Sequence, residues 1–242
     1  GRLAFEYVHD LGGRVLWSTS LDAGTHLTVF DAGGNLIESR DSRGARTLHA
    51  YDALRRPVRI WARDTAGDAV TLRQRLLYGD SPGAPQSATA NRLGRLYRHY
   101  DEAGLAEFSA YDFKGNVLAS SRQSLSDRFM LSAIDDPLRV TWTLPTPRVD
   151  WDEAAPPDLD VVIYATQTAY DALNRIKWSE MPACANGERY RIRPAYNAAA
   201  ALQGLSLVGP LDANGTGPER VFAERLAYDA RGQCVLIAYG NG

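Results

Sequence analysis

The sequence predicts an all-β fold built from consecutive β-hairpins. A short motif recurs along the chain: an aromatic or His residue, then Asp, two variable residues, usually Gly, and then Asn or Arg before an apolar run. The first three copies place Asp10, Asp31 and Asp52 at equal intervals of 21 residues. The composition, 45% hydrophobic and 10% aromatic, is that of a globular chain. Repetition of one supersecondary unit predicts an architecture before it predicts a chemistry.

The clearest copy of the motif runs from Tyr111 to Asn116. An Asp carboxylate suits the start of a tight turn because it accepts from backbone N–H groups two residues on. Gly three residues later supplies the positive φ that closes a hairpin loop, so we expect positive φ at Gly115. The residues that we assign to the repeated structural turn are Asp10, Gly13, Asp31, Gly34, Tyr51, Asp52, Tyr100, Asp101, Gly104, Tyr111, Asp112, Gly115, Tyr170, Asp171, Tyr196, Tyr228, Asp229 and Gly232.

Three copies lack Gly at the closing position. Asn174 tolerates the left-handed region and can replace it, whereas Arg55 and Ala200 depart from the pattern. We therefore predict that the turns at Arg55 and Ala200 are the least regular. The alanine run at 198–201 favours a helix by propensity, but the match of Asn197 to the Asp position predicts a hairpin there as well.

Short β-prone runs follow the turns, at 15–17, 36–37, 58–61, 117–118 and 234–237. Three stretches rich in Gly, Pro or polar residues interrupt the array, near 79–91, 137–160 and 208–219. Within the second, residues 140–144 could form one strand between flanking prolines. We expect a single repeat segment over residues 1–242, with these three stretches as irregular insertions.

Charge and hydropathy exclude several classes of protein. The 27 basic and 29 acidic residues give a net charge of −2, and the arginines alternate with carboxylates and apolar residues, so we expect no nucleic-acid partner. No apolar run is long enough for a transmembrane helix, and we expect no such segment. Cys184 and Cys234 are 50 residues apart; two free thiols are favoured because a chain of this size needs no disulfide scaffold, but pairing stays open.

Several ordered runs carry a family resemblance. They are Arg92 to Gly104, Tyr111 to Asn116, Ser120 to Gln123, Thr168 to Arg175, Arg193 to Asn197, Tyr228 to Gln233 and Ile237 to Gly242. Together they resemble the RHS, or YD-repeat, proteins, and are most similar to the late part of the B component of bacterial ABC-type insecticidal toxin complexes. The resemblance is strongest from about residue 92 onward, and before that it rests on the repeat alone.

The resemblance implies a curved open sheet that is a section of a hollow RHS shell. In that family the shell encloses a toxic C-terminal segment until delivery. The implied partners are adjoining RHS repeats of the same polypeptide, a partner toxin subunit and the encapsulated toxin polypeptide, and the implied location is secreted. The chain starts at Gly1 without Met or a leader, which we interpret as a piece of a longer polypeptide.

The sequence predicts no enzyme, cofactor or metal site. It has no G-x-S-x-G, P-loop, G-x-G-x-x-G or C-x-x-C motif. The histidines His9, His26, His49 and His99 lack metal-ligand spacing. A carboxylate cluster formed by Asp135, Asp136, Asp150, Asp152 and Glu153 is better explained as a solvated loop than as an acid–base pair.

RHS proteins commonly carry a self-cleaving aspartyl site with an Asp-Pro-x-Gly signature. Asp136-Pro137 matches its first half, but Arg139 stands where the signature has Gly, so we predict a turn and no protease.

Two alternatives to a shell segment remain at this stage. The first is a carbohydrate-binding adhesin module of the cell surface, with Trp17, Trp61, Trp142, Trp151 and Trp178 as binding platforms. The second, more remote, is a hydrolase that uses the acidic loop. The cargo, the target cell and the inward face of the sheet are not determined by these residues.

Overall fold

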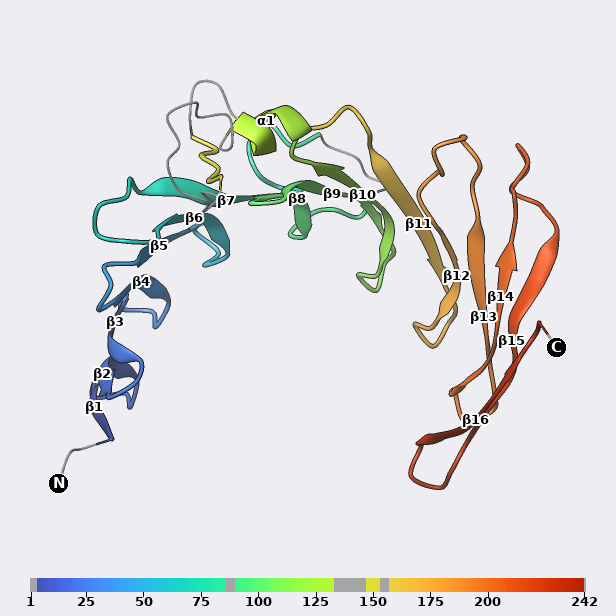
Figure 1. The fold of residues 1–242 in the computed structure, drawn as a ribbon, viewed down its shortest axis with the longest axis horizontal. Coiled ribbons are helices and arrows are strands. Elements are labelled where there is room, and N and C mark those ends of the chain that lie inside the picture. The colour runs from blue at the N-terminus through green and yellow to red at the C-terminus, as the bar shows by residue number, and fades with distance from the viewer. Residues whose placement is uncertain (1–3, 86–89, 133–146, 153–156, 242) are drawn as a thin grey trace. The chain divides into compact units, whose positions relative to one another are not determined.

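The computed structural model describes residues 4–85, 90–132, 147–152 and 157–241. In this part of the chain the fold is all-β, with 16 antiparallel strands in one open sheet (Figure 1). The strands are β1 Phe5–His9, β2 Val15–Ser20, β3 Gly24–Phe30, β4 Leu36–Asp41, β5 Arg46–Tyr51, β6 Pro57–Arg63, β7 Thr71–Tyr78, β8 Leu96–Asp101, β9 Gly104–Tyr111, β10 Val117–Ser124, β11 Tyr164–Tyr170, β12 Ile176–Glu180, β13 Arg191–Tyr196, β14 Leu202–Val208, β15 Glu219–Tyr228 and β16 Cys234–Tyr239. The predicted fold class is confirmed.

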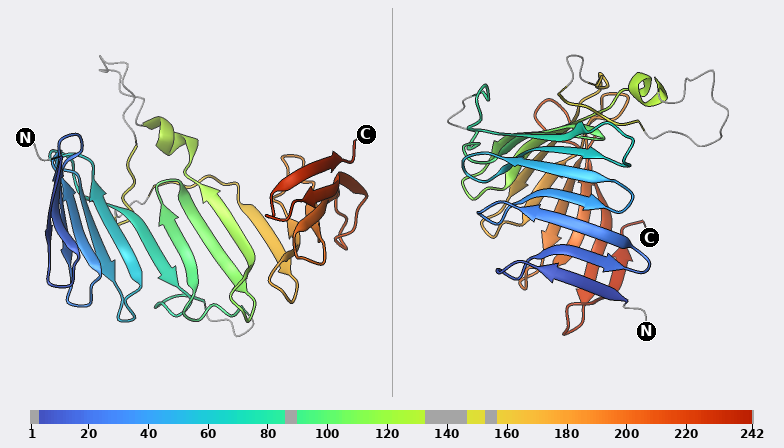
Figure 2. Two further views of the ribbon diagram at one scale, coloured as in Figure 1. Left: turned by 90° about the horizontal axis from the view of Figure 1, so that it is seen from below. Right: turned by 90° about the vertical axis from the view of Figure 1, so that its left-hand side faces the viewer.

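Each strand is hydrogen-bonded to its neighbours in sequence, in the order β1 to β16 (Figure 2). By its internal contacts the chain forms two compact units. Unit 1 comprises Gly1–Ala84, Leu96–Leu105 and Gln123–Val161, and unit 2 comprises Pro85–Arg95, Ala106–Arg122 and Val162–Gly242. Both units contain the repeated hairpin. No helix in the described residues is long and apolar enough to cross a membrane.

The pairing register changes just before the turn in most of the repeat hairpins. In unit 1 Val29 pairs with Glu38 but Phe30 pairs with Leu36, so Ile37 is an extra residue on the second strand. The same shift occurs in unit 2 between Ala169 and Tyr170. A one-residue bulge of this kind is the usual companion of a loop closed by a left-handed residue. The motif therefore defines a turn and a bulge together.

The buried core of unit 1 forms where part of the second insertion folds back onto the sheet. Leu72, Leu125, Val149 and Trp151 make up this core, and Trp61, Tyr100, Phe129 and Leu159 pack against it. We call residues 147–152 the plug. The sequence predicts an irregular excursion here; the plug contains no helix or strand, and it is packed, with Val149 fully buried. The possible strand at 140–144 lies outside the described residues.

A short helix precedes the plug and was not predicted. Helix α1 spans Asp127–Ser132, and the Ser126 hydroxyl accepts a hydrogen bond from the Phe129 N–H at 3.1 Å. This contact caps the first turn of the helix. Because Phe129 packs against the core, tertiary burial stabilises a helix that is too short to be stable alone.

Candidate functional site: the repeated turn and its tyrosine contact

The turn at Asp112 shows the geometry that the chain repeats. The backbone N–H of Asp112 donates to the Asn116 carbonyl (2.9 Å), and the N–H of Gly115 donates to the Asp112 carbonyl (3.2 Å). The Oδ1 atom of Asp112 accepts from the N–H groups of Lys114 and Asn116, both at 2.9 Å. One carboxylate oxygen thus satisfies donors that the tight loop would otherwise leave unpaired.

The closing position is left-handed in every described copy of this five-residue turn. Gly115 has a φ of 101°, in the region that the sequence predicts. Arg55 and Ala200, at 60° and 64°, adopt the same conformation. Their N–H groups donate to the carbonyls of Asp52 (2.9 Å) and Asn197 (3.0 Å). The expected irregularity of these two turns was therefore wrong, because the hydrogen bonds to Asp52 and Asn197 hold the backbone at some local steric cost.

The turn at Asp101 is different from its predicted form. Strand β8 ends at Asp101 and β9 begins at Gly104, so Glu102 and Ala103 alone form the loop. Gly104 does not close a five-residue turn. Instead, a Cβ atom at Gly104 would collide with the carbonyl oxygen of Gln123, so Gly is needed for close approach of the backbones.

Two further copies of the turn lie outside the assigned motif residues, although Asn214 and Gly215 were expected to form a hairpin turn. Asp41 and Asp212 accept from the N–H groups two and four residues on, and Gly44 and Gly215 close the turns with φ of 87° and 73°. Arg40 and Leu211 stand where the motif has an aromatic residue. The signal Asp-x-x-Gly alone would have found both.

In six of the described turns, the residue four positions after the Asp also contributes its side chain. It contacts the second carboxylate oxygen, Oδ2, as Asn116 Nδ2 does at 2.8 Å on Asp112. Where this residue is Arg, the contact is an ion pair. The equivalent donors are Arg14 Nε (2.6 Å), Asn35 Nδ2 (2.8 Å), Arg56 Nε (2.7 Å), Arg175 Nε (2.7 Å) and Thr216 Oγ1 (2.7 Å).

Four tyrosines, each near the end of a strand, join a hairpin to the preceding one. In unit 1 the Tyr51 hydroxyl donates to the Leu36 carbonyl at 2.8 Å. In unit 2 the Tyr228 hydroxyl donates to the Leu202 carbonyl at 2.9 Å. Each acceptor lies five residues after the Asp or Asn of the preceding turn. Tyr78 to Pro57 (3.0 Å) and Tyr196 to Ile176 (3.1 Å) repeat the contact.

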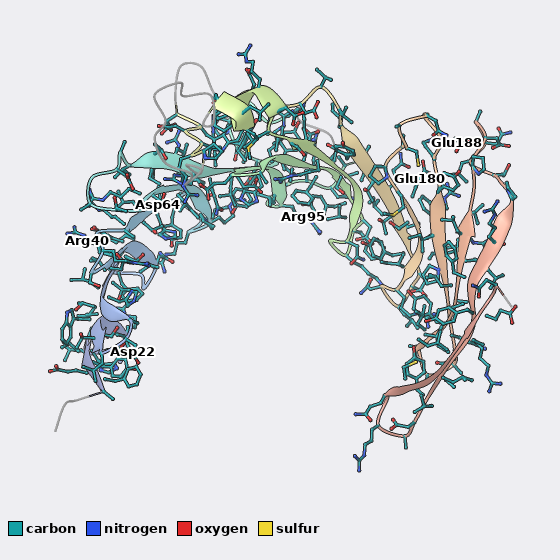
Figure 3. The ribbon with its side chains drawn as sticks, viewed as in Figure 1. Asp22, Arg40, Asp64, Arg95, Glu180 and Glu188 are labelled. Atoms are coloured by element: carbon teal, nitrogen blue, oxygen red, sulfur yellow. The ribbon has the colours of Figure 1, made fainter. Side chains whose placement is uncertain are left out.

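Arginines of the turn add a second link between successive hairpins. The Arg56 guanidinium pairs with Asp52 and stacks over the Tyr78 ring, 4.1 Å from its centroid. Arg175 stacks over Tyr196 in the same way at 4.6 Å. In unit 2 Arg95, labelled in Figure 3, lies over Tyr111 at 5.3 Å. Each such arginine connects the turn of one hairpin to the aromatic residue of the next.

Hydrogen bonding determines the electrostatics of the turn carboxylates. The backbone N–H of Arg14 is the main influence that lowers the pKa of Asp10 below its ordinary value of 3.8. The amide side chain of Asn35 does the same for the pKa of Asp31. These carboxylates are therefore held ionised as hydrogen-bond acceptors, which suits a structural role and not a proton-transfer role.

The remaining predicted motif residues take related places. Tyr100 packs against Trp151, with ring centroids 5.1 Å apart, and Tyr170 is at the register shift of β11. Burial raises the pKa of Tyr111. Asp229 accepts from the N–H groups of Arg231 (2.8 Å) and Gln233 (2.9 Å), and Gly232 closes that turn.

The described members of the carboxylate cluster hold the plug. Asp150 Oδ1 accepts from the Leu72 N–H (3.1 Å), and Asp152 Oδ2 accepts from the Trp61 indole N–H (3.2 Å). Asp135, Asp136 and Glu153 lie outside the described residues, as does the Asp136-Pro137 turn. Among the residues that the structure describes, no group of His, Cys, Asp and Glu could hold a metal ion.

Two of the proposed tryptophan platforms are packed in unit 1. Trp61 and Trp151 lie at the plug, and Trp151 donates to the Asp101 carbonyl (3.2 Å). Trp178 in unit 2 lies beneath the Arg191 guanidinium. Cys184 and Cys234 are both free and exposed.

Antiparallel hairpins closed by left-handed turns after Asp or Asn, with four tyrosine hydroxyls linking successive hairpins, form the open sheet that the resemblance to RHS proteins implies. Comparison with known proteins agrees with this class. Toxin subunit YenC2 of Yersinia entomophaga is 26% identical over 253 residues, covering 98% of this chain and 24% of the relative. Toxin subunit YenC1 of the same organism is 28% identical over 239 residues, covering 98% of this chain and 22% of the relative.

Solved structures give the same result at the level of the fold. A crystal structure of TcdB2-TccC3 matches with a TM-score of 0.74 and 23% identity, covering 99% of this chain and 10% of that one. A Tc holotoxin pore of Photorhabdus luminescens matches with a TM-score of 0.71 and 25% identity, covering 98% and 10%. No family model matches the chain. The resemblance to RHS-repeat subunits of toxin complexes is confirmed, and the chain spans about a quarter of the length of its curated relatives.

Proposed function

We propose that this chain is a wall section of a hollow β-shell in a secreted bacterial toxin, and that the shell encloses a toxic C-terminal cargo polypeptide. The observation that carries the proposal is the tyrosine contact, which occurs in both units and ties four hairpins to the preceding ones. The similarity to toxin subunits over 98% of this chain supports a role in a toxin complex.

The proposed mechanism is steric and needs no catalytic group. Neighbouring strands of a sheet are about 4.8 Å apart and leave no gap through which a polypeptide could pass. In each unit, the turns and tyrosine contacts hold successive hairpins together at the edge where the strand ladder ends. A wall built in this way would separate its cargo from proteases and other proteins in the surrounding solution until delivery.

The proposal also names partners. Adjoining RHS repeats of the same polypeptide would continue the sheet, a partner toxin subunit would complete the shell, and the cargo would contact one face. The chain itself would act without cofactor, metal or enzymatic activity.

Photo-crosslinking in the full-length polypeptide tests this proposal. Leu27 and Thr28 are adjacent on β3 and therefore project to opposite faces of the sheet. A photoreactive amino acid at one of these positions should crosslink to the cargo region of the same polypeptide, and at the other it should not. The matched pair serves as its own control. Crosslinks from neither position, or equally from both, would contradict a wall that has an inner and an outer face.

A further inference from the structure

Five arginines lie on one face of unit 1, although they are dispersed in the sequence. Side chains two or four residues apart on a strand share a face, and directly paired residues of antiparallel neighbours do so too. Arg40 pairs with Arg46, and Arg46 pairs with Arg63 on the next strand. We call the set Arg40, Arg46, Arg59, Arg63 and Arg75 the arginine face; Figure 3 labels Arg40 at one end of it.

The arginine face is only partly neutralised. Glu38 pairs with both Arg40 and Arg46. The Nε atom of Arg63 donates to the Gly44 carbonyl at 3.0 Å. Arg59 and Arg75 are directly opposite each other on β6 and β7, and neither has an ion-pair or hydrogen-bond partner among the residues that the structure describes.

Like charges at directly opposite positions destabilise a sheet unless an anion lies between or beside them. Arg59 and Arg75 also line a hollow of about 550 Å³, together with Leu77, Asp80 and Pro82. Asp80 makes no ion pair with Arg59 or Arg75, because both of its carboxylate oxygens accept from Arg56, at 3.0 and 3.1 Å. Asp52 and Arg56 also line the hollow, and Asp52 pairs with Arg56 as Asp80 does. The hollow therefore presents Arg59 and Arg75 beside two carboxylates that are already engaged by Arg56.

Nearby carboxylates are likewise already occupied. Glu102 Oε1 accepts from Arg73 (2.6 Å) and from Arg148 of the plug (3.0 Å). Asp64 Oδ2 pairs with the same two arginines, at 3.4 and 2.8 Å. Each of these two carboxylates is thus engaged by two arginines other than Arg59 and Arg75.

The plug shows which kind of segment this face accepts. Trp61 stands between Arg59 and Arg63 on β6 and faces the plug. The plug buries Val149 and Trp151 there, while Asp150 and Asp152 accept from the Leu72 N–H and the Trp61 indole. An extended stretch in which aromatic or aliphatic side chains alternate with carboxylates is therefore complementary to this surface.

The same face continues beyond the plug as exposed apolar surface. Trp17 pairs with Leu27, and Leu27 pairs with Arg40, so these three residues share the face. Leu27 is 37% exposed. A second segment with side chains like those of the plug would find apolar contacts here and the unpaired Arg59 and Arg75 on β6 and β7 of the same face.

We propose that the arginine face is a docking surface for an extended acidic segment of a partner polypeptide that carries aromatic side chains, with Arg59 and Arg75 as its principal carboxylate contacts. This inference does not depend on the shell function. It requires only the face, the unpaired arginines and the precedent of the plug.

Fluorescence anisotropy with a labelled octapeptide, Asp-Trp-Asp-Glu repeated twice, tests the proposal on the whole chain. The double substitution Arg59→Gln with Arg75→Gln should weaken binding about tenfold, since two solvent-accessible ion pairs are lost. The charge-matched control is Arg225→Gln with Arg231→Gln, at exposed positions in unit 2, and it should change the affinity less than about twofold. Arg59→Lys with Arg75→Lys keeps the charges and should retain most of the binding.

Three results would overturn the proposal. They are absence of peptide binding by the parent chain, equal weakening by the two charge-matched double variants, and tighter binding of a single-stranded oligonucleotide than of the peptide at the same salt concentration. Circular dichroism of each variant verifies that it is folded. If the variant with Arg59→Gln and Arg75→Gln is unfolded, the variant with Arg59→Lys and Arg75→Lys is used in its place. If that variant binds a peptide whose acidic residues are replaced by Lys as tightly as it binds the acidic peptide, the assignment is contradicted.

Discussion

The aspartate of the repeated turn acts as a hydrogen-bond acceptor for the backbone. Asn197 shows which part of this role needs the charge. Its Oδ1 accepts from the N–H groups of Ala199 and Ala201 at 3.0 Å, as the Asp residues do. The backbone hydrogen bonds therefore do not need the negative charge. Where the residue is Asp, the charge allows an additional ion pair with an arginine four residues on, as between Asp171 and Arg175.

Gly115 is a position where a side chain should be harmful to a turn. Its φ of 101° is unfavourable for an L-residue, and a Cβ atom would also clash with the Arg95 guanidinium. Gly115→Val should lower the free energy of unfolding by about 1 to 2 kcal/mol in urea denaturation. Lys114→Ala, which removes one exposed hydrogen bond to the Ala172 carbonyl, is the control and should cost much less. Equal effects of the two substitutions would contradict the conformational argument.

The turn carboxylates predict how stability depends on pH. Hydrogen bonds hold the pKa values of Asp10, Asp31 and Asp171 below 3.8 in the folded chain. A lowered folded-state pKa contributes stability that is present above the unfolded value and is lost as pH falls through the folded value. The free energy of unfolding should therefore decrease as pH is lowered from about 5 to below 3.

Denaturation at a series of pH values measures this dependence. Asp31→Asn gives this turn an amide acceptor like that of Asn197. The variant should keep the backbone hydrogen bonds, and its free energy of unfolding should depend less on pH in the acid range than that of the parent. Stability that is unchanged or rises as pH falls from about 5 to about 3 would show that these hydrogen bonds do not favour the ionised form.

At the scale of the element, the tyrosine contact joins one hairpin to the next. Tyr78 is buried, and its hydroxyl donates to the Pro57 carbonyl. Tyr78→Phe should lower the free energy of unfolding by about 1 kcal/mol and leave the partly buried Pro57 carbonyl without its side-chain donor. Tyr239→Phe, at a 65% exposed position, is the control. Faster amide exchange around 57 and 78, without change at 239, is the expected pattern; identical behaviour of the two variants would argue against a joining role.

The plug is the element with the largest buried side chains in unit 1. Trp151 is 6% exposed, packs at a tilt against the Tyr100 ring and donates to the Asp101 carbonyl. Trp151→Ala should cost about 3 to 5 kcal/mol in the unfolding of unit 1 and expose the plug to proteases. Leu131→Ala, in α1 and 56% exposed, should be nearly neutral. Wild-type protease resistance of the Trp151 variant would mean that the plug is not held by this packing.

At the scale of the whole molecule, the hairpin array was predictable because the turn is local. An Asp followed by a left-handed residue specifies the loop within five positions, so the fold class and the conformation of Gly115 followed from short patterns. The regular geometry of the turns at Arg55 and Ala200 was not predicted, because the sequence shows the steric penalty but not the hydrogen bonds that offset it.

Long-range arrangements were beyond the sequence for a different reason. The partner of each tyrosine lies 15 to 26 residues away, and the plug meets β7 across a separation of 78 residues. The arginine face depends on the exact register between β4 and β7. In the sequence these arginines alternate with other residues, and that alternation is what brings them to one face of the sheet.

Protection of the cargo is the most direct measure of the shell proposal. In the full-length polypeptide, limited proteolysis followed by mass spectrometry should leave the cargo region intact while exposed linkers are cut. Tyr196→Ala with Tyr228→Ala removes two contacts between hairpins and should make the cargo region cleavable, whereas Tyr239→Ala should not. A cargo region that is cut as fast in the parent as in the isolated segment would contradict the claim that this chain is part of an enclosing wall.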